Sequence, residues 1–346
     1  MRWRPGDWWS RSPPAALFAT SPDRFLHLAP LEATVTGWTT ADLPALDDHT
    51  VVVTGANSGL GLAGTRAFAD AGATVVMACR SVERGDRAAT DVRESVPDAD
   101  LDVRECDLAS LASVESFATD LRAAYDAVDV LCNNAGLMAI PRRETEAGFE
   151  MQLGVNHLGH FALTGQLFPL LAAADGQSRV VTQSSGLHER GEMDFSDLHW
   201  ETAYDKWDAY GRSKLANLLF AYELQRRLDA RDRADVLSVA CHPGYADTNL
   251  QARTAAESGS PLVKLGMRVA NALLAQSAER GALPMLYAAT ADVDGGDYVG
   301  PGGLFDMRGA PEIQESSAAS RDEAHARRLW DHSVEATGVT YPFDAD

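Results

Sequence analysis

Short apolar runs alternate along the chain with longer stretches in which apolar residues recur at helical spacing. The apolar runs are HTVVVTG, ATVVMACR, DLDVREC, AVDVLCNNAG, SRVVTQSS and DVLSVACHPG, all between residues 49 and 244. The stretches between them have a helical pattern, including a long one from about Phe149 to Ala174. Strands that alternate with helices in this way form right-handed βαβ units, and their parallel sheet is buried on both faces. The pattern therefore predicts an α/β fold with one doubly wound parallel β-sheet and helices on both of its faces.

The same pattern predicts three parts of the chain. Residues 1–35 have no periodicity and are broken by prolines, so we expect a poorly ordered N-terminal extension; a start site assigned too far upstream fits these residues equally well. The α/β domain is expected over residues 40–310. Residues 311–346 are expected to form a C-terminal helical tail, because RDEAHARRLWDHSVEATG has an amphipathic pattern.

The charge is unusual in its make-up as well as in its size. The formal net charge is −20; only three of the 30 basic residues are lysines, and 32 of the 50 acidic residues are aspartates. This composition resembles that of proteins from salt-loving cytosols, in which a dense carboxylate surface stays hydrated and its self-repulsion is screened. An acidic soluble enzyme of another source explains the charge but not the scarcity of lysine. In either case the charge disfavours a nucleic-acid partner.

The four cysteines lie far apart and form no CxxC motif or Cys/His cluster. Each is near the end of an apolar run, so we expect buried free thiols in a reducing, cytoplasmic compartment and no metal site. No run approaches the roughly 20 apolar residues that a membrane span requires.

Ligands of a doubly wound sheet bind at the carboxyl ends of its strands, so the residues that follow each apolar run carry the chemistry. The first run is followed by TGANSGLG, in which Gly55, Gly59 and Gly61 allow a tight turn and close approach of a pyrophosphate. A glycine-rich turn without a ligand is the alternative. The residues of this turn expected to bind a dinucleotide cofactor are Gly55, Asn57, Ser58, Gly59, Leu60 and Gly61.

The second run selects the dinucleotide. It ends in Ala78-Cys79-Arg80-Ser81 and has no acidic residue at its tip to bind the ribose hydroxyls. Arg80 is suited to pair with a 2′-phosphate, which favours NADP(H) over NAD(H), although NAD(H) stays possible. The alternative is an ordinary surface arginine.

The third and fourth runs add further cofactor candidates. Asp107, followed by Leu108, is placed either to accept the adenine amino group or to cap the next helix. The fourth run ends in Asn133-Asn134-Ala135-Gly136, small residues that let a flat ring lie against the backbone.

A helix predicted over residues 209–228 places Tyr210 and Lys214 four apart, on one face near its start. An ammonium beside a phenol favours the phenolate and lowers the pKa of the phenol, which then exchanges a proton with a carbonyl or alcohol oxygen near neutral pH. Ser185, after the fifth run, would hold that oxygen, and Lys214 would also bind the nicotinamide ribose. Ser184 is the competing serine.

The motifs TGANSGLG, NNAG, VNHLGHF, SSG, YGRSK and HPG together resemble the short-chain dehydrogenase/reductase family, from about Thr50 to Arg308. The resemblance implies a Rossmann-type fold and a catalytic tetrad of Asn156, Ser185, Tyr210 and Lys214. In it, Asn156 kinks the long helix and holds a water that links the lysine to solvent. The alternative for Asn156 is a helix-interior polar residue bonded to its own backbone.

The finer resemblance is to the branch that contains retinol dehydrogenases, the WW-domain oxidoreductase and protochlorophyllide reductases. The family resemblance also implies cofactor contacts from Pro243, Gly244 and Thr248, with a stiff Pro-Gly turn as the alternative, and it makes the second serine of the pair, Ser185, the catalytic one. The 25-residue separation of Ser185 and Tyr210 leaves room for a substrate loop over residues 186–208. Residues 246–275 are expected to form a lid over the substrate, with a long surface insertion as the alternative.

These features predict an NADP(H)-dependent oxidoreductase for a carbonyl or alcohol substrate, with Tyr210 as general acid/base. A catalytically silent dinucleotide-binding regulator is the alternative, although it has no need of an activated phenol. The aromatic and apolar residues of the loop favour a bulky apolar substrate, unless they serve packing; they are Met193, Phe195, Trp200, Tyr204 and Trp207. The resemblance implies a homodimer or homotetramer through the helices of Asn156 and Tyr210.

Overall fold

The computed structural model describes residues 37–244, 277–303 and 308–343. The expected extension over residues 1–35 and the expected lid over residues 246–275, with Thr248, lie outside the described residues.

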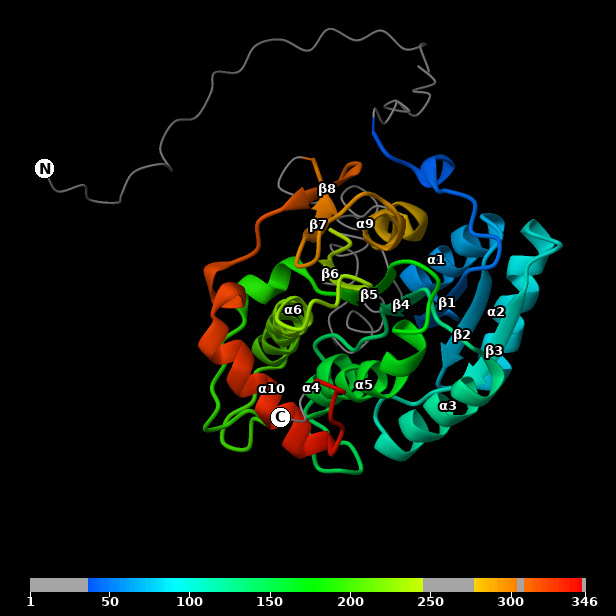
Figure 1. The fold of residues 1–346 in the computed structure, drawn as a ribbon. Helices are drawn as coiled ribbons and strands as arrows, with labels where there is room; N and C mark the ends of the chain where they lie inside the picture. Colours follow the sequence, from blue (N-terminus) through cyan, green and yellow to red (C-terminus); the bar gives the residue numbers. More distant parts are fainter. Residues whose placement is uncertain (1–36, 245–276, 304–307, 344–346) are drawn as a thin grey trace, which may run out of the picture. The chain divides into compact units, whose positions relative to one another are not determined.

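One eight-stranded sheet forms the centre of the described domain, with the strand order β3-β2-β1-β4-β5-β6-β7-β8 (Figure 1). All neighbouring strands are parallel except β7 and β8, which are antiparallel. The strands are β1 (Thr50–Thr54), β2 (Thr74–Cys79), β3 (Leu101–Glu105), β4 (Val130–Asn133), β5 (Ser178–Gln183), β6 (Val236–Cys241), β7 (Tyr298–Pro301) and β8 (Pro311–Gln314). The predicted doubly wound α/β fold is confirmed. The apolar runs did not predict the short strands β7 and β8, and β8 begins the segment expected to be a helical tail.

Helices cover both faces of the sheet. The first face packs on α1 (Gly59–Asp70), α2 (Val82–Ser95) and α9 (Ala278–Thr290), and the second on α3 (Leu111–Ala124), α5 (Gly159–Leu171) and α6 (Lys206–Asp229). The shorter elements are η1 (Thr40–Asp42), α4 (Met151–Leu153), η2 (Gly154–Leu158), η3 (Gly186–Arg190) and η5 (Ala318–Arg321). In β1, Val51 and Val53 enter the first core and Val52 the second, so apolar residues must follow one another without alternation.

The long helix predicted from about Phe149 is interrupted by a π-helical turn. The segment α4 leads into the π turn η2, which leads directly into α5. In η2 the amide of Gly159 donates to the carbonyl of Gly154, five residues earlier. The turn contains Asn156, where the family resemblance implied a kink.

The last helix, α10 (Glu323–Thr337), packs on α6, α5 and η2. Trp330 is its anchor: the indole ring meets Phe161 edge-on at 5.0 Å between centroids, stacks on Phe220 at 6.0 Å and lies 4.6 Å from the ring of Tyr341. Trp330 is 2% exposed, so this helix belongs to the core of the domain.

The four cysteines, Cys79, Cys106, Cys132 and Cys241, are buried and free, as expected. Among the described helices, none has both the length and the apolar character that a membrane crossing requires.

Replacing Trp330 with alanine should lower the free energy of unfolding by about 3–5 kcal/mol, because it removes a large aromatic side chain that the core cannot refill. Urea unfolding followed by far-UV circular dichroism measures this difference. Asp331→Ala, at an exposed neighbour on the same helix, should change stability by about 0.5 kcal/mol or less. Equal stability of the two variants would mean that α10 is not part of the cooperative unit.

Candidate active site

The turn between β1 and α1 has the geometry of a phosphate-binding loop. Gly55 and Gly59 adopt φ values of +67° and +55°, which favour glycine. A Cβ on Gly61 would lie 2.4 Å from the carbonyl oxygen of Gly55 and 2.6 Å from Asn134 Nδ2, so the turn has no room for a side chain there. Ser58, the N-cap of α1, makes no side-chain capping bond, which leaves first-turn amides of the helix to bind an anion. This cradle fits the pyrophosphate of a dinucleotide.

The hydroxyl of Thr54, at the end of β1, holds the NNAG segment against the glycine turn. The amides of Asn134 and Ala135 both donate to Thr54 Oγ1 at 2.9 Å. Asn134 Nδ2 also donates to the carbonyl of Thr54 at 2.7 Å. Asn133 is buried, and its Nδ2 donates to Thr164 Oγ1 at 2.9 Å. These bonds fix the path of the chain up to Gly136, where it leaves the sheet beside the glycine turn.

Arg80 and Asp107 follow β2 and β3 on the side of the sheet beyond β1. Arg80 is exposed, and within the described residues its guanidinium makes no ion pair. Asp107 Oδ1 accepts from the amide of Ala109 at 3.0 Å, whereas the N-cap of α3 is Ser110. The structure thus excludes Asp107 as the cap of that helix, since its carboxylate closes the turn that precedes the cap. Leu108 is buried.

Ser185, Tyr210 and Lys214 come together at the carboxyl end of β5. The side chains of Ser185 and Tyr210 are neighbours, near enough for Ser185 to lower the pKa of the phenol. Lys214 Nζ donates to the carbonyl of Gln183 at 3.0 Å and lies 5.9 Å from the centroid of the Tyr210 ring. Ser184 Oγ instead donates to the carbonyl of Lys214 at 2.9 Å. Of the two serines, Ser185 is therefore the one that meets the phenol.

The expected lowering of the Tyr210 pKa by Lys214 is not found. Burial raises the pKa of Tyr210 to about 12, and the neighbouring Ser185 offsets only part of that shift. Burial also lowers the pKa of Lys214 to about 8. Both side chains are less than a tenth exposed. Loss of hydration is therefore the largest influence on the pKa of Tyr210, and the sequence-based expectation had not taken this burial into account.

Asn156 bridges the NNAG segment and the Tyr210 helix. Its Oδ1 accepts from the amide of Leu137 at 2.7 Å, and its Nδ2 donates to the carbonyl of Leu137 and to Ser213 Oγ, both at 2.9 Å. A Cβ on Gly136 would lie 3.2 Å from Asn156 Oδ1 and 3.5 Å from Lys214 Nζ. The side chain of Asn156 thus bonds to neighbouring segments and not to its own backbone. All four tetrad candidates meet around the ends of β4 and β5.

Further along the sheet, Pro243 and Gly244 follow β6. Gly244 has a φ of +63°, and its amide donates to His242 Nδ1 at 3.3 Å. The resemblance implies cofactor contacts from both residues, which stay a prediction; the segment that follows, with Thr248, is outside the described residues.

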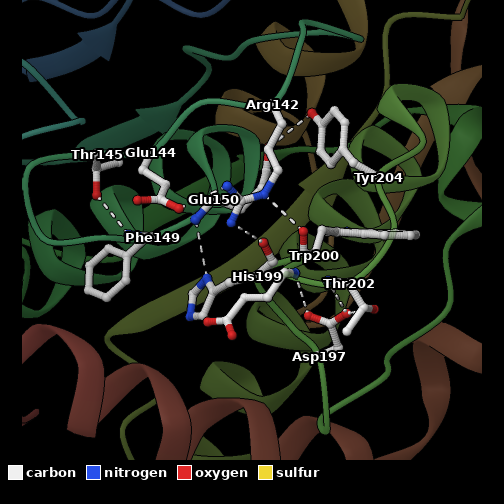
Figure 2. A network of polar contacts seen from close by, with 11 residues as sticks. Arg142, Glu144, Thr145, Phe149, Glu150, Asp197, His199, Trp200, Thr202 and Tyr204 are labelled. Atoms are coloured by element: carbon white, nitrogen blue, oxygen red, sulfur yellow. Dashed lines mark hydrogen bonds and ion pairs between the residues drawn. The ribbon is translucent and has the colours of Figure 1, made fainter.

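The expected substrate loop, residues 186–208, is held by a polar network (Figure 2). Arg142 donates from Nε to the carbonyl of Trp200 at 2.8 Å and from Nη2 to the carbonyl of His199 at 3.3 Å. The amide of Glu150 donates to His199 Nδ1 at 3.2 Å, and Tyr204 OH lies 3.1 Å from the Glu150 carboxylate. The loop is therefore anchored to the segment that joins β4 to α4.

Gln152 connects this network to the candidate site. Its Oε1 accepts from the amide of Ala139 at 2.7 Å, in the loop that follows NNAG. Its Nε2 donates to Tyr204 OH at 2.8 Å and to the carbonyl of Lys206 at 3.0 Å, at the start of α6. Ala139 has a φ of +49°, a strained conformation for a residue with a side chain. One buried amide thus ties the loop beside Gly136 to the beginning of the Tyr210 helix. Sequence spacing gave no sign of this role, since its partners lie far apart along the chain.

Most apolar residues of the loop serve packing. Met193 and Leu198 are buried in a small core with residues of α4, α6 and α10, and Phe195 packs against it. The Trp200 ring lies under the guanidinium of Arg212 at 4.0 Å. These contacts support the packing alternative for Met193, Phe195 and Trp200. Trp207 is partly exposed in the first turn of α6.

Comparison with known proteins gives the family. The profile described as short chain dehydrogenase matches residues 49–259. The chain belongs to the short-chain dehydrogenase family. Human retinol dehydrogenase 13 is 40% identical over 313 residues, which cover 89% of this chain and 90% of the relative. Mouse polyprenol dehydrogenase is 40% identical over 300 residues and covers 86% of each chain.

A solved structure of an uncharacterized protein from Mycobacterium paratuberculosis is also similar to this short-chain dehydrogenase. It has a TM-score of 0.73 and 42% identity, and the match covers 89% of this chain and 100% of that one. The expected family, its Rossmann-type fold and the similarity to retinol dehydrogenases are thus confirmed. The chain is an oxidoreductase.

Replacing Gln152 with leucine should lower the free energy of unfolding by about 2–5 kcal/mol, because the Ala139 amide and the Lys206 carbonyl lose their buried partner. The amide of Ala139 should also exchange its hydrogen faster, which hydrogen exchange followed by mass spectrometry measures. Gln177→Leu, at an exposed glutamine, is the control and should change neither quantity appreciably. Unchanged exchange at Ala139 in Gln152→Leu would contradict the role given to the amide.

Proposed function

We propose that this short-chain dehydrogenase transfers a hydride between NADP(H) and a carbonyl or alcohol substrate, with Tyr210 as general acid/base. The proposal rests on the meeting of Ser185, Tyr210 and Lys214 at the carboxyl end of β5. The glycine turn follows β1 at the same edge of the sheet. That edge of the sheet is where doubly wound folds bind their ligands.

The bound nicotinamide would supply the hydride to the carbonyl carbon in reduction, or accept it in oxidation. The chain's own residues handle the oxygen and the proton. Ser185 Oγ donates a hydrogen bond to the carbonyl oxygen, and the Tyr210 hydroxyl gives its proton to that oxygen as the C–H bond forms. A phenol with a raised pKa is protonated at neutral pH, as this direction requires. In oxidation the proton returns to Tyr210.

Lys214 and Asn156 support this exchange. The ammonium of Lys214 stabilises the phenolate left on Tyr210 after the proton has moved, since the two groups are close and poorly hydrated. From the family pattern, Asn156 would hold a water that passes the proton on to solvent. The glycine turn, Arg80, Asp107, the NNAG segment, Pro243 and Gly244 would hold the cofactor, with Thr248 included from the family pattern.

The similarity to retinol and polyprenol dehydrogenases suggests an apolar alcohol or aldehyde as the substrate. The tight packing of residues 186–208 means that their aromatic residues are weaker support for this choice than the sequence implied. A homodimer or homotetramer, a cytoplasmic location and an origin in a salt-loving organism stay predictions. The helices implied for self-association have α10 packed on them.

Replacing Tyr210 with phenylalanine should lower turnover by about 10²–10⁴-fold and leave cofactor affinity unchanged, because only the proton donor is removed. The measurement is NADPH and NADH oxidation in high KCl with a panel of aldehydes and ketones, retinal among them. Tyr222→Phe is the matched control, since its buried hydroxyl lies on the same helix and bonds Ser316 at 2.7 Å. Tight cofactor binding without turnover by the wild type on any carbonyl would favour the silent-regulator alternative.

Replacing Arg80 with alanine should weaken NADPH binding roughly tenfold to hundredfold and change NADH binding little, because only NADPH carries the 2′-phosphate. Isothermal titration with each cofactor measures both affinities. Arg87→Ala removes a similar charge from an exposed ion pair with Glu83 on α2 and should have a small effect. Equal weakening of both cofactors by Arg80→Ala would rule out the 2′-phosphate assignment.

A further inference from the structure

His160 is a buried histidine of α5 that the proposed chemistry does not use. It is 2% exposed, and both of its ring nitrogens have partners. Nδ1 lies 3.0 Å from the carbonyl oxygen of Asn156, and Nε2 lies 2.9 Å from Thr54 Oγ1. One imidazole therefore connects the π turn to the hydroxyl that holds the NNAG segment.

The hydrogen-bond pattern determines the tautomer. The carbonyl of Asn156 can only accept, so Nδ1 carries a proton. Burial lowers the pKa of His160 to about 4, so the ring is neutral and Nε2 must accept. Thr54 then donates its single hydroxyl proton to His160, whose Nε2 is nearer than the Cys132 carbonyl oxygen at 3.2 Å.

Thr54 in turn receives the amides of Asn134 and Ala135, each at 2.9 Å. An unbroken chain of hydrogen bonds thus runs from the amides of the NNAG segment through Thr54 and His160 to the backbone of Asn156. The side chain of Asn156 continues it to Leu137 and to Ser213, the residue before Lys214.

We propose that His160 is a positioning residue of the active site. By donating from Nδ1 to the carbonyl of Asn156, it sets the conformation of the π turn and so the place of Asn156 beside Lys214. Its bond to Thr54 ties this turn to the same hydroxyl that holds NNAG. Displacement of Asn156 would change the surroundings of the ammonium, although no part of His160 needs to touch substrate. This inference rests on the proposed function, because its effect is exerted through Asn156 and Lys214.

His157 provides a matched control within the same π turn. It is 1% exposed, and burial lowers the pKa of its imidazole to about 3. Its Nε2 bonds Ser333 Oγ at 2.8 Å, on α10. It is thus as buried as His160 but faces the C-terminal helix. A histidine that only supports folding should behave like His157.

Two substitutions separate the bonds of His160. In His160→Asn the amide reaches the position of Nδ1 and still donates to the Asn156 carbonyl, while Thr54 can turn to Cys132. In His160→Gln the amide reaches the position of Nε2 and the carbonyl of Asn156 loses its donor. We expect kcat to fall roughly tenfold to hundredfold in His160→Gln and clearly less in His160→Asn. The apparent pKa of the kcat/KM profile should also move in His160→Gln.

His157→Asn, whose amide does not reach the position of Nε2 and so loses the bond to Ser333, should lower stability without moving kcat per folded molecule or the pH profile. Wild-type kcat and pH profile in His160→Gln, or equal losses in both His160 variants, would overturn the inference. These outcomes are separate from failure of the proposed function, which is read from Tyr210→Phe: if that variant keeps full turnover, the proposed chemistry is wrong whatever His160 does.

A second measurement needs no variant. With 15N-labelled histidine, NMR of the wild-type protein should show His160 as the Nδ1–H tautomer at pH 7, and still neutral at pH 5. The resonance is assigned from the spectrum of His160→Asn. An Nε2–H tautomer, or protonation near pH 6.5, would contradict the hydrogen-bond chain.

Discussion

The candidate active site is arranged around a buried ammonium group at the carboxyl end of β5. Lys214 is 3% exposed, and its Nζ donates to a backbone carbonyl, that of Gln183. Removing a charge from water is unfavourable unless neighbouring dipoles replace its hydration, and burial accordingly lowers the pKa of this lysine to about 8. The same burial raises the pKa of Tyr210, so each group is held nearer to its neutral form. The phenol therefore keeps its proton at neutral pH, which is the form that the proposed reduction requires.

Such a site requires that the polar groups around it be satisfied within the protein. Thr54 and Asn133, which end β1 and β4, are buried, so their polar groups need partners within the protein. Thr54 accepts two backbone amides there, and Asn134 and Asn156 close the remaining backbone groups of the neighbouring loops. Packing, as well as cofactor binding, explains why the NNAG segment has small residues. The chain passes between the glycine turn and Lys214, and Gly136 has little room for a Cβ.

The sequence predicted what depends on local pattern. The six apolar runs gave the parallel strands, because residues such as Val51, Val52 and Val53 are buried on both faces in turn. The glycine turn and the Tyr210 helix were predicted for similar reasons. The strands β7 and β8 were not, since strands of four residues are too short to leave a periodic signal. The predicted shift of the Tyr210 pKa was wrong in direction, because burial depends on contacts from the whole fold. The anchoring of residues 186–208 by Arg142 and Gln152 was also out of reach, as each bond joins residues more than 50 positions apart.

The segment VNHLGHF shows why spacing alone could not assign its polar residues. In an ordinary α-helix, His157 and His160 are three apart and share a face. The π turn over Gly154–Leu158 widens the helix, and the two imidazoles point to different neighbours: one to Ser333 of α10, the other to Thr54 of β1. Asn156 lies in the π turn between α4 and α5. Its side chain bonds Leu137, and its carbonyl oxygen bonds His160. A single altered turn therefore separates a histidine that bonds the C-terminal helix from one that reaches the carboxyl end of β1, and burial lowers the pKa of both imidazoles.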